Sequence, residues 1–243
     1  AFFNTLLVGH SGAPLASFDV EAGQGGFLAI PGSANIRPRL ARSSVGVPRA
    51  SFGDGGLTRL NGLPCSDSQD SLTASVVLGD RLYAVGNSLI GGTPYPFVAC
   101  FNLANGRLDT SFAGKGWLFL PQAAGETYSL NSCALQATAG SNYLIVAGLS
   151  YDGTAYHSQV ARLQLDGRLD TAFGANDFWR DTIAQVDAPV FCQVDSVGRI
   201  LVAYTENNTL PMVCAARLTA TGVLDSSLVS AAAACGPRRV RAR

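Results

Sequence analysis

Hydrophobic residues in this chain fall in short runs separated by glycine, proline, asparagine and aspartate. One such series comprises Val76–Leu78, Arg81–Gly86 and Phe97–Phe101, which are rich in β-branched and aromatic residues. Runs of this length between turn residues predict a meander of antiparallel strands. The sequence carries no sustained apolar period of about 3.6 residues, which argues against a helical repeat.

The series recurs along the chain, and its clearest marker is ARLQLDGRLDTAF at Ala161–Phe173. Imperfect copies stand at Arg39–Phe52, Ala99–Phe112 and Ala216–Leu228, at intervals of roughly sixty residues. The residues that define the repeat in the later copies are Gly106, Asp109, Phe112, Arg162, Asp166, Gly167, Asp170, Phe173, Arg217, Gly222 and Asp225. Repetition at this period indicates a propeller, a solenoid or an array.

About four strands per repeat is the number found in a propeller blade. We therefore predict an all-β fold, a β-propeller-like array of about four four-stranded antiparallel blades in a single domain, 1–243. Along it we distinguish an irregular first unit, three regular units and a tail, at 1–57, 58–112, 113–173, 174–228 and 229–243.

The two ends of the chain each hold part of a unit. The N-terminal strand Phe2–Gly9 and the segment Leu228–Ala234 are expected to share the last blade, because such closure removes open sheet edges. The alternative is an open array whose edges pair with another chain, as in a filament.

The strand ending in Ala-Arg-Leu, the Asp-Gly turn and the following Leu-Asp-Thr-Ala-Phe-Gly together resemble the delta-60 repeat. The resemblance covers roughly residues 39–228 and is strongest at 158–179. It implies a β-propeller-type fold in an exported or surface protein of bacteria. Asn105 and Thr221 depart from the pattern at the position of Asp166, and Cys100 departs at that of Arg162.

Composition narrows the classes of partner. Seventeen basic residues balance seventeen acidic ones, so no global field attracts nucleic acid or an anionic membrane. No apolar run reaches the roughly 18 residues that a membrane-spanning helix needs. The chain begins with Ala1 and no methionine, which fits removal of a secretory signal. We expect an extracellular, cell-surface or periplasmic protein.

The cysteines are six, an even number, and they lack the spacing of a zinc site. Disulfides are the favoured interpretation, and free core thiols are the alternative. At least two bridges are expected among Cys65, Cys100, Cys133, Cys192, Cys214 and Cys235.

The sequence GHSGA at residues 9–13 resembles the nucleophile elbow of α/β-hydrolases, in which a sharp turn exposes a serine. Ala13 stands in place of the last glycine, and Pro14 follows where the elbow requires a helix. A plain strand-to-turn segment is the favoured interpretation. The alternative is a serine hydrolase that uses Ser11 as nucleophile and His157 as base.

The other polar residues are interpreted as structural. Asp109, Asp170 and Asp225 are expected to fix turns by accepting local backbone hydrogen bonds, with ligands around a channel as the alternative. Arg162 and Arg217 are expected to pair with acidic turn residues. Neither histidine has a neighbour at metal-ligand spacing, so neither a metal nor another cofactor is expected.

Phe52, Phe112 and Phe173, with Trp117 and Trp179, are interpreted as aromatic residues that pack between blades. A surface that stacks on carbohydrate is the alternative.

The function expected from these patterns is that of a non-enzymatic binding or assembly module, exported to a bacterial surface. A ring-shaped monomer and a subunit of an extracellular filament are the two forms left open. A protein partner or self-assembly is favoured over a small molecule. Binding residues are expected in the variable loops at Gly86–Pro96, Ser150–Ser158 and Glu206–Pro211.

Overall fold

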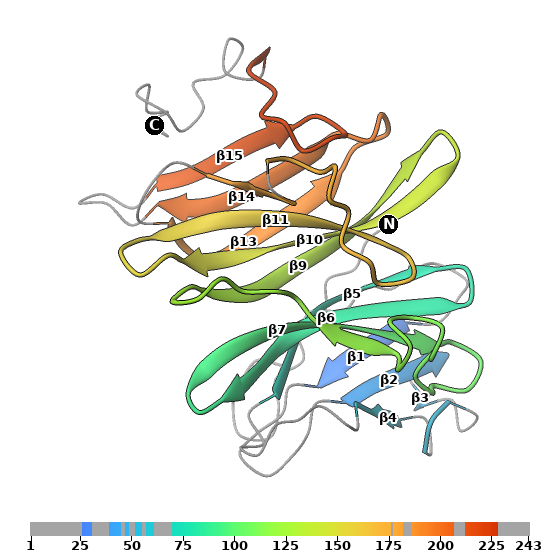
Figure 1. Ribbon diagram of the computed structural model, residues 1–243. Helices are drawn as coiled ribbons and strands as arrows, with labels where there is room; N and C mark the ends of the chain where they lie inside the picture. The colour runs from blue at the N-terminus through green and yellow to red at the C-terminus, as the bar shows by residue number, and fades with distance from the viewer. Residues whose placement is uncertain are drawn as a thin grey trace. The chain divides into compact units, whose positions relative to one another are not determined.

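The computed structural model describes residues 26–30, 39–44, 47–48, 52–54, 57–60, 70–175, 177–181, 186–206 and 212–227. Its elements are antiparallel β-strands, as the all-β prediction requires (Figure 1). The chain divides into two compact units, Ala1–Leu120 and Pro121–Arg243. In the part of the chain described, no helix has the length and apolar character to cross a membrane.

The first unit contains two sheets. In the N-terminal sheet, β2 pairs with β1, β3 and β4; the strands are β1 (Gly26–Ile30), β2 (Arg39–Ser44), β3 (Val47–Pro48) and β4 (Leu57–Arg59). The second sheet has the order β5-β6-β7-β8; its strands are β5 (Asp70–Leu78), β6 (Arg81–Ile90), β7 (Thr93–Asn102) and β8 (Trp117–Phe119). Phe52, Phe97, Phe101 and Trp117 belong to the core of this unit.

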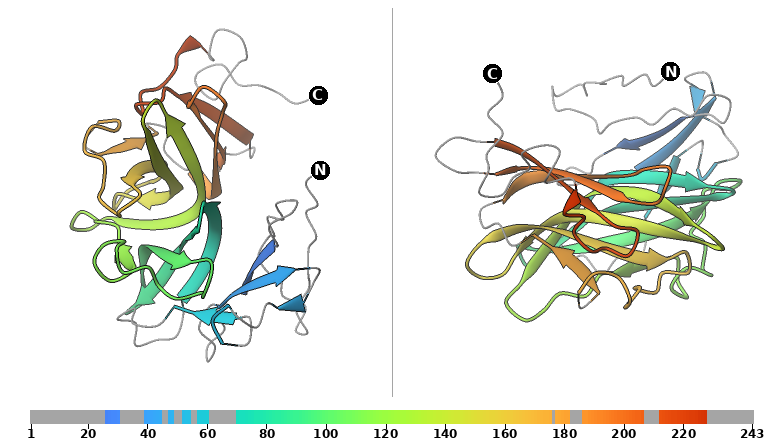
Figure 2. Two further views of the ribbon diagram at one scale, coloured as in Figure 1. Left: turned by 90° about the vertical axis from the view of Figure 1, so that its right-hand side faces the viewer. Right: turned by 90° about the horizontal axis from the view of Figure 1, so that it is seen from above.

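The second unit also contains two sheets. The larger has the order β12-β11-β10-β9; its strands are β9 (Thr127–Thr138), β10 (Ser141–Tyr151), β11 (Tyr156–Gln164) and β12 (Phe178–Arg180). The smaller has the order β13-β14-β15; its strands are β13 (Val186–Val194), β14 (Ile200–Glu206) and β15 (Met212–Leu218). Figure 2 shows these strands from two further sides.

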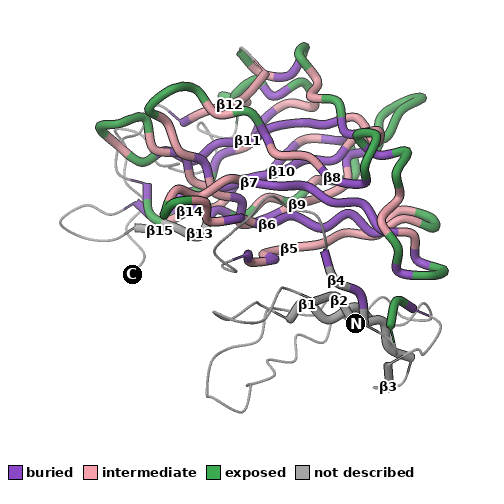
Figure 3. Tube along the Cα trace, turned by 60° about the horizontal axis from the view of Figure 1, so that its bottom comes forward, coloured by how far each residue is buried: buried purple, intermediate pink, exposed green. Residues whose placement is uncertain are grey.

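The two sheets of the second unit pack through their apolar faces. Ile145 and Val160 of the larger sheet share one buried cluster with Val190, Ile200 and Val202 of the smaller sheet. Phe173 completes the cluster and is fully buried. Buried positions run along the central strands, and exposed positions gather at the hairpin tips (Figure 3).

The sheets are offset from the sequence repeats by one strand. β8 pairs with β7 and β12 pairs with β11, so each closes the sheet of the preceding repeat. The sequence units 113–173 and 174–228 instead place Trp117–Phe119 and Phe178–Arg180 at their own beginnings. The difference arises because the repeat turn reverses the chain and returns it beside the strand that it has just left.

A β-bulge sets the same bend in the two four-stranded sheets β5–β8 and β9–β12. The first strand of each carries one extra residue opposite Gly86 or Gly148. A Cβ atom at either glycine would lie 1.9 Å from a backbone oxygen, that of Ser71 or Ser129. Only glycine therefore fits where the bulged strand crosses its neighbour.

The predicted closure of the last blade stays a prediction. Both Phe2–Gly9 and Leu228–Ala234 lie outside the described residues. Within the residues described, β15 has one strand neighbour, β14, whereas β7 and β11 have two each.

Candidate functional site

The repeated aspartates close the turns that follow β7, β11 and β15, the third strands of the three later sheets. The backbone N–H groups of Asp109, Asp170 and Asp225 donate to carbonyl oxygens at the end of that strand. Each carboxylate in turn accepts a hydrogen bond from the backbone N–H two residues later, at Ser111, Ala172 and Ser227. These are the local bonds that the turn interpretation requires.

Each of these carboxylates also pairs with an arginine. Arg162 lies 2.7 Å from Asp170, and Arg217 lies 2.8 Å from Asp225. In the first regular sheet Cys100 occupies the arginine position, and Arg81 of β6 supplies the partner, 2.9 Å from Asp109. The sequence departure at Cys100 is thus compensated from a neighbouring strand.

Arg162 connects the two sheets of the second unit. Its guanidinium donates to Gln136 Oε1 and to the carbonyl of Ala220, which belongs to the following repeat. Its Cζ atom lies 4.4 Å from the ring centre of Tyr143 and 5.0 Å from that of Phe173. This buried arginine, 7 % exposed, is therefore part of the framework and not an open anion site.

Phe52 and Phe173, each at the end of a repeat, pack beneath the turn of the next repeat. Phe52 and Phe173 are fully buried, and the glycine after each donates to a turn carbonyl of the next repeat. Gly53 donates to Asn105 over 2.8 Å, and Gly174 donates to Thr221 over 2.9 Å. The bond uses only a backbone carbonyl, which explains why the turn residue can vary. Phe112 is likewise buried, as the packing interpretation predicts.

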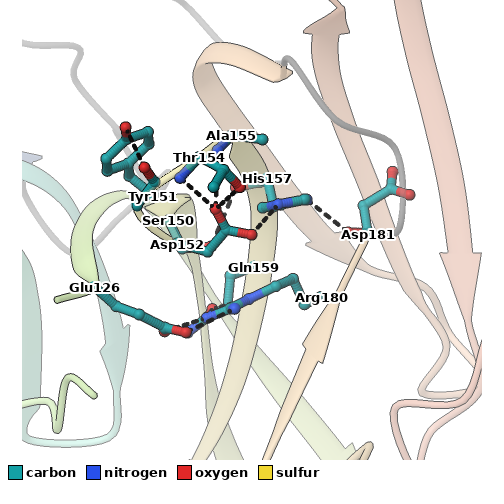
Figure 4. A network of polar contacts seen from close by, with 11 residues as sticks. Glu126, Ser150, Tyr151, Asp152, Thr154, Ala155, His157, Gln159, Arg180 and Asp181 are labelled. Atoms are coloured by element: carbon teal, nitrogen blue, oxygen red, sulfur yellow. Dashed lines mark hydrogen bonds and ion pairs between the residues drawn. The ribbon is translucent and has the colours of Figure 1, made fainter. Parts of the chain in front are cut away.

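A cluster of polar contacts lies at the β10–β11 hairpin, around His157 (Figure 4). Its Nε2 lies 3.0 Å from the Asp152 carboxylate, and its Nδ1 lies 3.0 Å from the carbonyl oxygen of Asp181. Both neighbours are hydrogen-bond acceptors, so both bonds form together only when the ring carries two protons. His157 is buried, and it could serve as a general base only by giving up one of these contacts.

The hairpin turn holds Asp152 in its ionised form. The hydroxyl of Thr154 donates to the carboxylate, as do the backbone N–H groups of Thr154 and Ala155. These bonds hold the pKa of Asp152 well below its usual range. The sequence contains a signal for this turn, an Asp-Gly pair shortly before a histidine, although the difference between the repeats predicts a variable loop at 150–158.

A second arrangement of charges adjoins the histidine. Arg180 of β12 donates to both carboxylate oxygens of Glu126 and also to the side-chain oxygen of Gln159. The bonds from Arg180 lower the pKa of Glu126. Together the two arrangements connect the ends of β9, β11 and β12. Their charged side chains are already bonded to one another.

The hydrolase alternative, with Ser11 as nucleophile and His157 as base, stays a prediction. Ser11 lies outside the described part of the chain, and His157 is engaged at both ring nitrogens. Among the described residues no group of three His, Cys, Asp or Glu side chains could hold a metal ion.

The cysteine expectation needs correction. Cys100, Cys133 and Cys192 take part in no disulfide. The remaining three cysteines could form one intramolecular bridge at most, so the expected minimum of two is wrong. Strand alternation gives the reason: Ser132 contacts Cys192 over 3.5 Å, so the next residue, Cys133, points to the opposite face.

The expected binding loop at Gly86–Pro96 is also mostly strand. β6 continues to Ile90 and β7 begins at Thr93, leaving only Gly91 and Gly92 as the turn. Both glycines have positive φ angles, 59° and 82°, which suits a two-residue hairpin. Residues 207–211 of the third expected loop lie outside the described chain.

Large apolar side chains are exposed on the sheet β13–β15. Phe191 is 56 % exposed, Leu201 39 % and Val213 83 %. Strand register places Phe191 beside Ala203 and Val213 beside Thr205, on the face opposite to the buried Ile200 and Val202. We call this surface the outward face of β13–β15. Sequence alternation alone could not reveal it, because buried and exposed strand positions here are both apolar.

Two stretches of the chain, residues 80–112 and 142–173, match a family model described as a "Domain of unknown function (DUF5122) beta-propeller". Each matched stretch runs from the second strand of a sheet to the aromatic residue that ends the repeat. The match supports a β-propeller-type repeat, a coarser assignment than the delta-60 repeat. No curated protein matches the chain.

Proposed function

We propose that this chain, built from β-propeller-type repeats, is an exported, non-enzymatic binding or assembly module of a bacterial cell surface. The outward face of β13–β15 carries the proposal, because clustered exposed apolar side chains on a sheet mark an interaction surface. Its neighbours on the sheet are mainly small or neutral, so the surface suits a protein partner better than a charged small molecule.

The engagement of the repeated polar residues supports a scaffold role. Asp170 and Asp225 bind their own turns and arginines, and Arg162 bridges two sheets. Side chains that hold sheets together leave recognition to positions where the repeats differ. Phe191 is such a position. It lies opposite Ala203 of β14. In the preceding sheet the equivalent alanine, Ala147, lies opposite Ser132.

The finer fold belongs to the same proposal. We expect a delta-60-type array of about four blades, in which the strand Phe2–Gly9 pairs with the edge of β15. Hydrogen exchange tests the pairing. Deletion of residues 2–9 should accelerate exchange of the β15 amides and leave the β11 amides unchanged. Equal exchange in both proteins would contradict it.

Two measurements test the function. Fractionation of cells that make the natural protein should recover it outside the cytoplasm, and recovery from the cytoplasm alone would contradict export. Treatment of the full chain with a fluorophosphonate probe should give no labelling. Labelling that disappears in Ser11→Ala would instead establish a serine hydrolase.

A further inference from the structure

His157 of β11 joins two other segments of the second unit. On one side of its ring lies the Asp152 carboxylate, in the turn between β10 and β11. On the other side lies the carbonyl oxygen of Asp181, the residue after β12. Tyr204 of β14 donates to the Asp181 carboxylate. Through this ring the tip of the β10–β11 hairpin is connected to a residue that also contacts the smaller sheet.

The two bonds place a condition on the protonation of the ring. Asp152 accepts three further hydrogen bonds, from Thr154 and Ala155, which keep its carboxylate ionised, and a backbone carbonyl can only accept. Both ring nitrogens must therefore carry a proton for both bonds to form. A neutral ring has one N–H group and presents a lone pair to the other acceptor.

The two acceptors differ in what they lose when the ring gives up a proton. The Asp152 side chain is 30 % exposed, so water can replace the ring as donor, and the bonds within its own turn remain. Asp181 is only 9 % exposed, and a buried carbonyl without a donor is the more costly loss. The neutral ring should therefore keep its Nδ1–H bond to Asp181 and release Asp152.

Charged groups of the surrounding segments also lie around the ring. Asp152 lies in the hairpin turn, Glu126 precedes β9, and Arg180 and Asp181 lie at the end of β12 (Figure 4). Arg180 is bonded to both carboxylate oxygens of Glu126, so these two charges largely cancel. The Asp152 carboxylate is bonded to the ring directly. Loss of a ring proton consequently removes the positive charge that this carboxylate faces.

We propose that His157 is a pH-sensitive switch that controls the mobility of the β10–β11 hairpin. In acid the doubly protonated ring connects the turn at Asp152 to the end of β12. At higher pH the Nε2 proton passes to water, the bond to Asp152 is lost, and the turn is released. Histidine side chains ordinarily change charge between about pH 5 and pH 8. The released tip carries Tyr156, which is 49 % exposed and packs against Tyr151.

NMR spectroscopy of the full chain from about pH 5 to about pH 9 tests the switch, a range that brackets the ordinary titration of histidine. The background is His10→Ala, which leaves His157 as the one histidine of the chain. The ring nitrogen shifts should change from those of the doubly protonated form to those of the Nδ1–H tautomer. With the same midpoint, the order parameter of the Thr154 amide should fall from about 0.85 toward 0.6.

Asp152→Asn tests the assignment of the partner. The three bonds within the turn go to Oδ1, whereas His157 bonds Oδ2. An amide at this position can keep the turn bonds and donate from its NH2 group to an unprotonated Nε2. The midpoint of the ring titration should therefore fall by at least about one pH unit, and Thr154 should stay ordered at high pH.

Asp166→Asn is the matched control. It removes a carboxylate that also accepts a backbone hydrogen bond in a turn, but this turn lies at the other end of the nine-residue strand β11. The midpoint of the His157 titration should be the same as in the natural chain, because the distance and the solvent screen the charge.

Each outcome decides the question. A ring that keeps one protonation state over the whole range overturns the switch, as does a midpoint that Asp152→Asn leaves unchanged. So does a Thr154 amide whose order does not follow the ring. If Asp152→Asn does not fold, His157→Gln replaces it: a side chain that does not titrate should abolish the pH dependence of Thr154, and a dependence that persists overturns the proposal. None of these results bears on export or on fluorophosphonate labelling, so the proposed function is judged separately.

Discussion

Arg162 and Arg168 lie on the same repeat, yet their ion pairs have different surroundings. The side chains of Arg162 and Asp170 are 8 % and 13 % exposed, whereas those of Arg168 and Asp166 are 74 % and 44 % exposed. Water screens the Arg168–Asp166 pair, whereas burial largely excludes water from the Arg162–Asp170 pair. Burial therefore decides which of the two pairs matters for stability.

Arg162→Ala should lower the free energy of unfolding by about 3 kcal/mol, because it removes a buried guanidinium and leaves the half-buried Asp170 carboxylate without its partner. Arg168→Ala should change it by less than about 1 kcal/mol. Urea unfolding followed by tryptophan fluorescence measures both values. Equal losses in the two variants would show that the Arg162 contacts to Gln136 and Ala220 contribute little.

The free thiols Cys100 and Cys192 are predicted to be unreactive in the folded protein. Burial raises the pKa of each to about 12, so almost no thiolate exists at neutral pH. Alkylation with iodoacetamide at pH 8, followed by peptide mass spectrometry, should modify both residues in urea and neither in native buffer. Rapid native alkylation of Cys192 would contradict the prediction that its raised pKa makes it unreactive.

At the scale of the element, the bulge glycines define the bend of the first strand in each four-stranded sheet. In the smaller sheet of the second unit, Tyr204 stands in the place of Gly148, and its hydroxyl bonds to the Asp181 carboxylate. The irregularity of β13 is correspondingly wider, between Asp187 and Phe191. A side chain thus fits at the position of Gly148 and Tyr204 only where the irregularity of the first strand is wider, as it is in β13.

Gly148→Ala should destabilise the protein by about 3 kcal/mol or more, because its Cβ would meet the Ser129 carbonyl and the strands must separate. Gly79→Ala is the control: φ is +60° there, and the added Cβ meets nothing within 4 Å. Its cost should be about 1 to 2 kcal/mol, that of a left-handed backbone with a side chain. Thermal unfolding by circular dichroism compares the two, and similar melting temperatures would argue against the bulge as a steric constraint.

The sequence was sufficient to predict the strands and the repeated turn, because alternation and turn residues act locally. It could not assign Trp117–Phe119 to its sheet, since pairing between strands depends on the path of the chain in space. The cluster around His157 escaped for a related reason: Glu126, Asp152 and Arg180 are far apart in sequence, and no spacing rule joins them. The cysteines were misjudged because an even count says nothing about which face of a strand each occupies.

At the scale of the whole molecule, several carboxylates share one response to acid. Bonds from the Ser227 hydroxyl and then from Arg217 lower the pKa of Asp225 to about 2. Bonds from the Ser111 hydroxyl, with Arg81, lower the pKa of Asp109, and Arg180 lowers that of Glu126. Each carboxylate binds protons more weakly when folded, so it stabilises the fold above its ordinary pKa and ceases to do so in acid.

These carboxylates should accordingly contribute a constant amount to the free energy of unfolding near neutral pH, and that amount should fall as the pH drops from about 4 toward 2. Urea titrations at a series of pH values measure this dependence. Asp225→Asn should make the fall shallower, because one of the groups with a lowered pKa is gone. A fall in Asp225→Asn as steep as that of the natural chain, or steeper, would contradict the assignment.

The ion pair of the first regular sheet differs from its counterparts in where its partners come from. Arg162 and Asp170 flank a single turn, as do Arg217 and Asp225, whereas Arg81 and Asp109 are separated by the whole of β7. Repeat proteins change length when copies of a repeat are gained or lost by recombination. A recombination crossover between β6 and β7 would separate Asp109 from Arg81. A duplicated copy of a later repeat would instead contain both members of its ion pair. The later repeats are thus the transferable ones, and shuffled chains built from them should fold more readily than chains that duplicate the first.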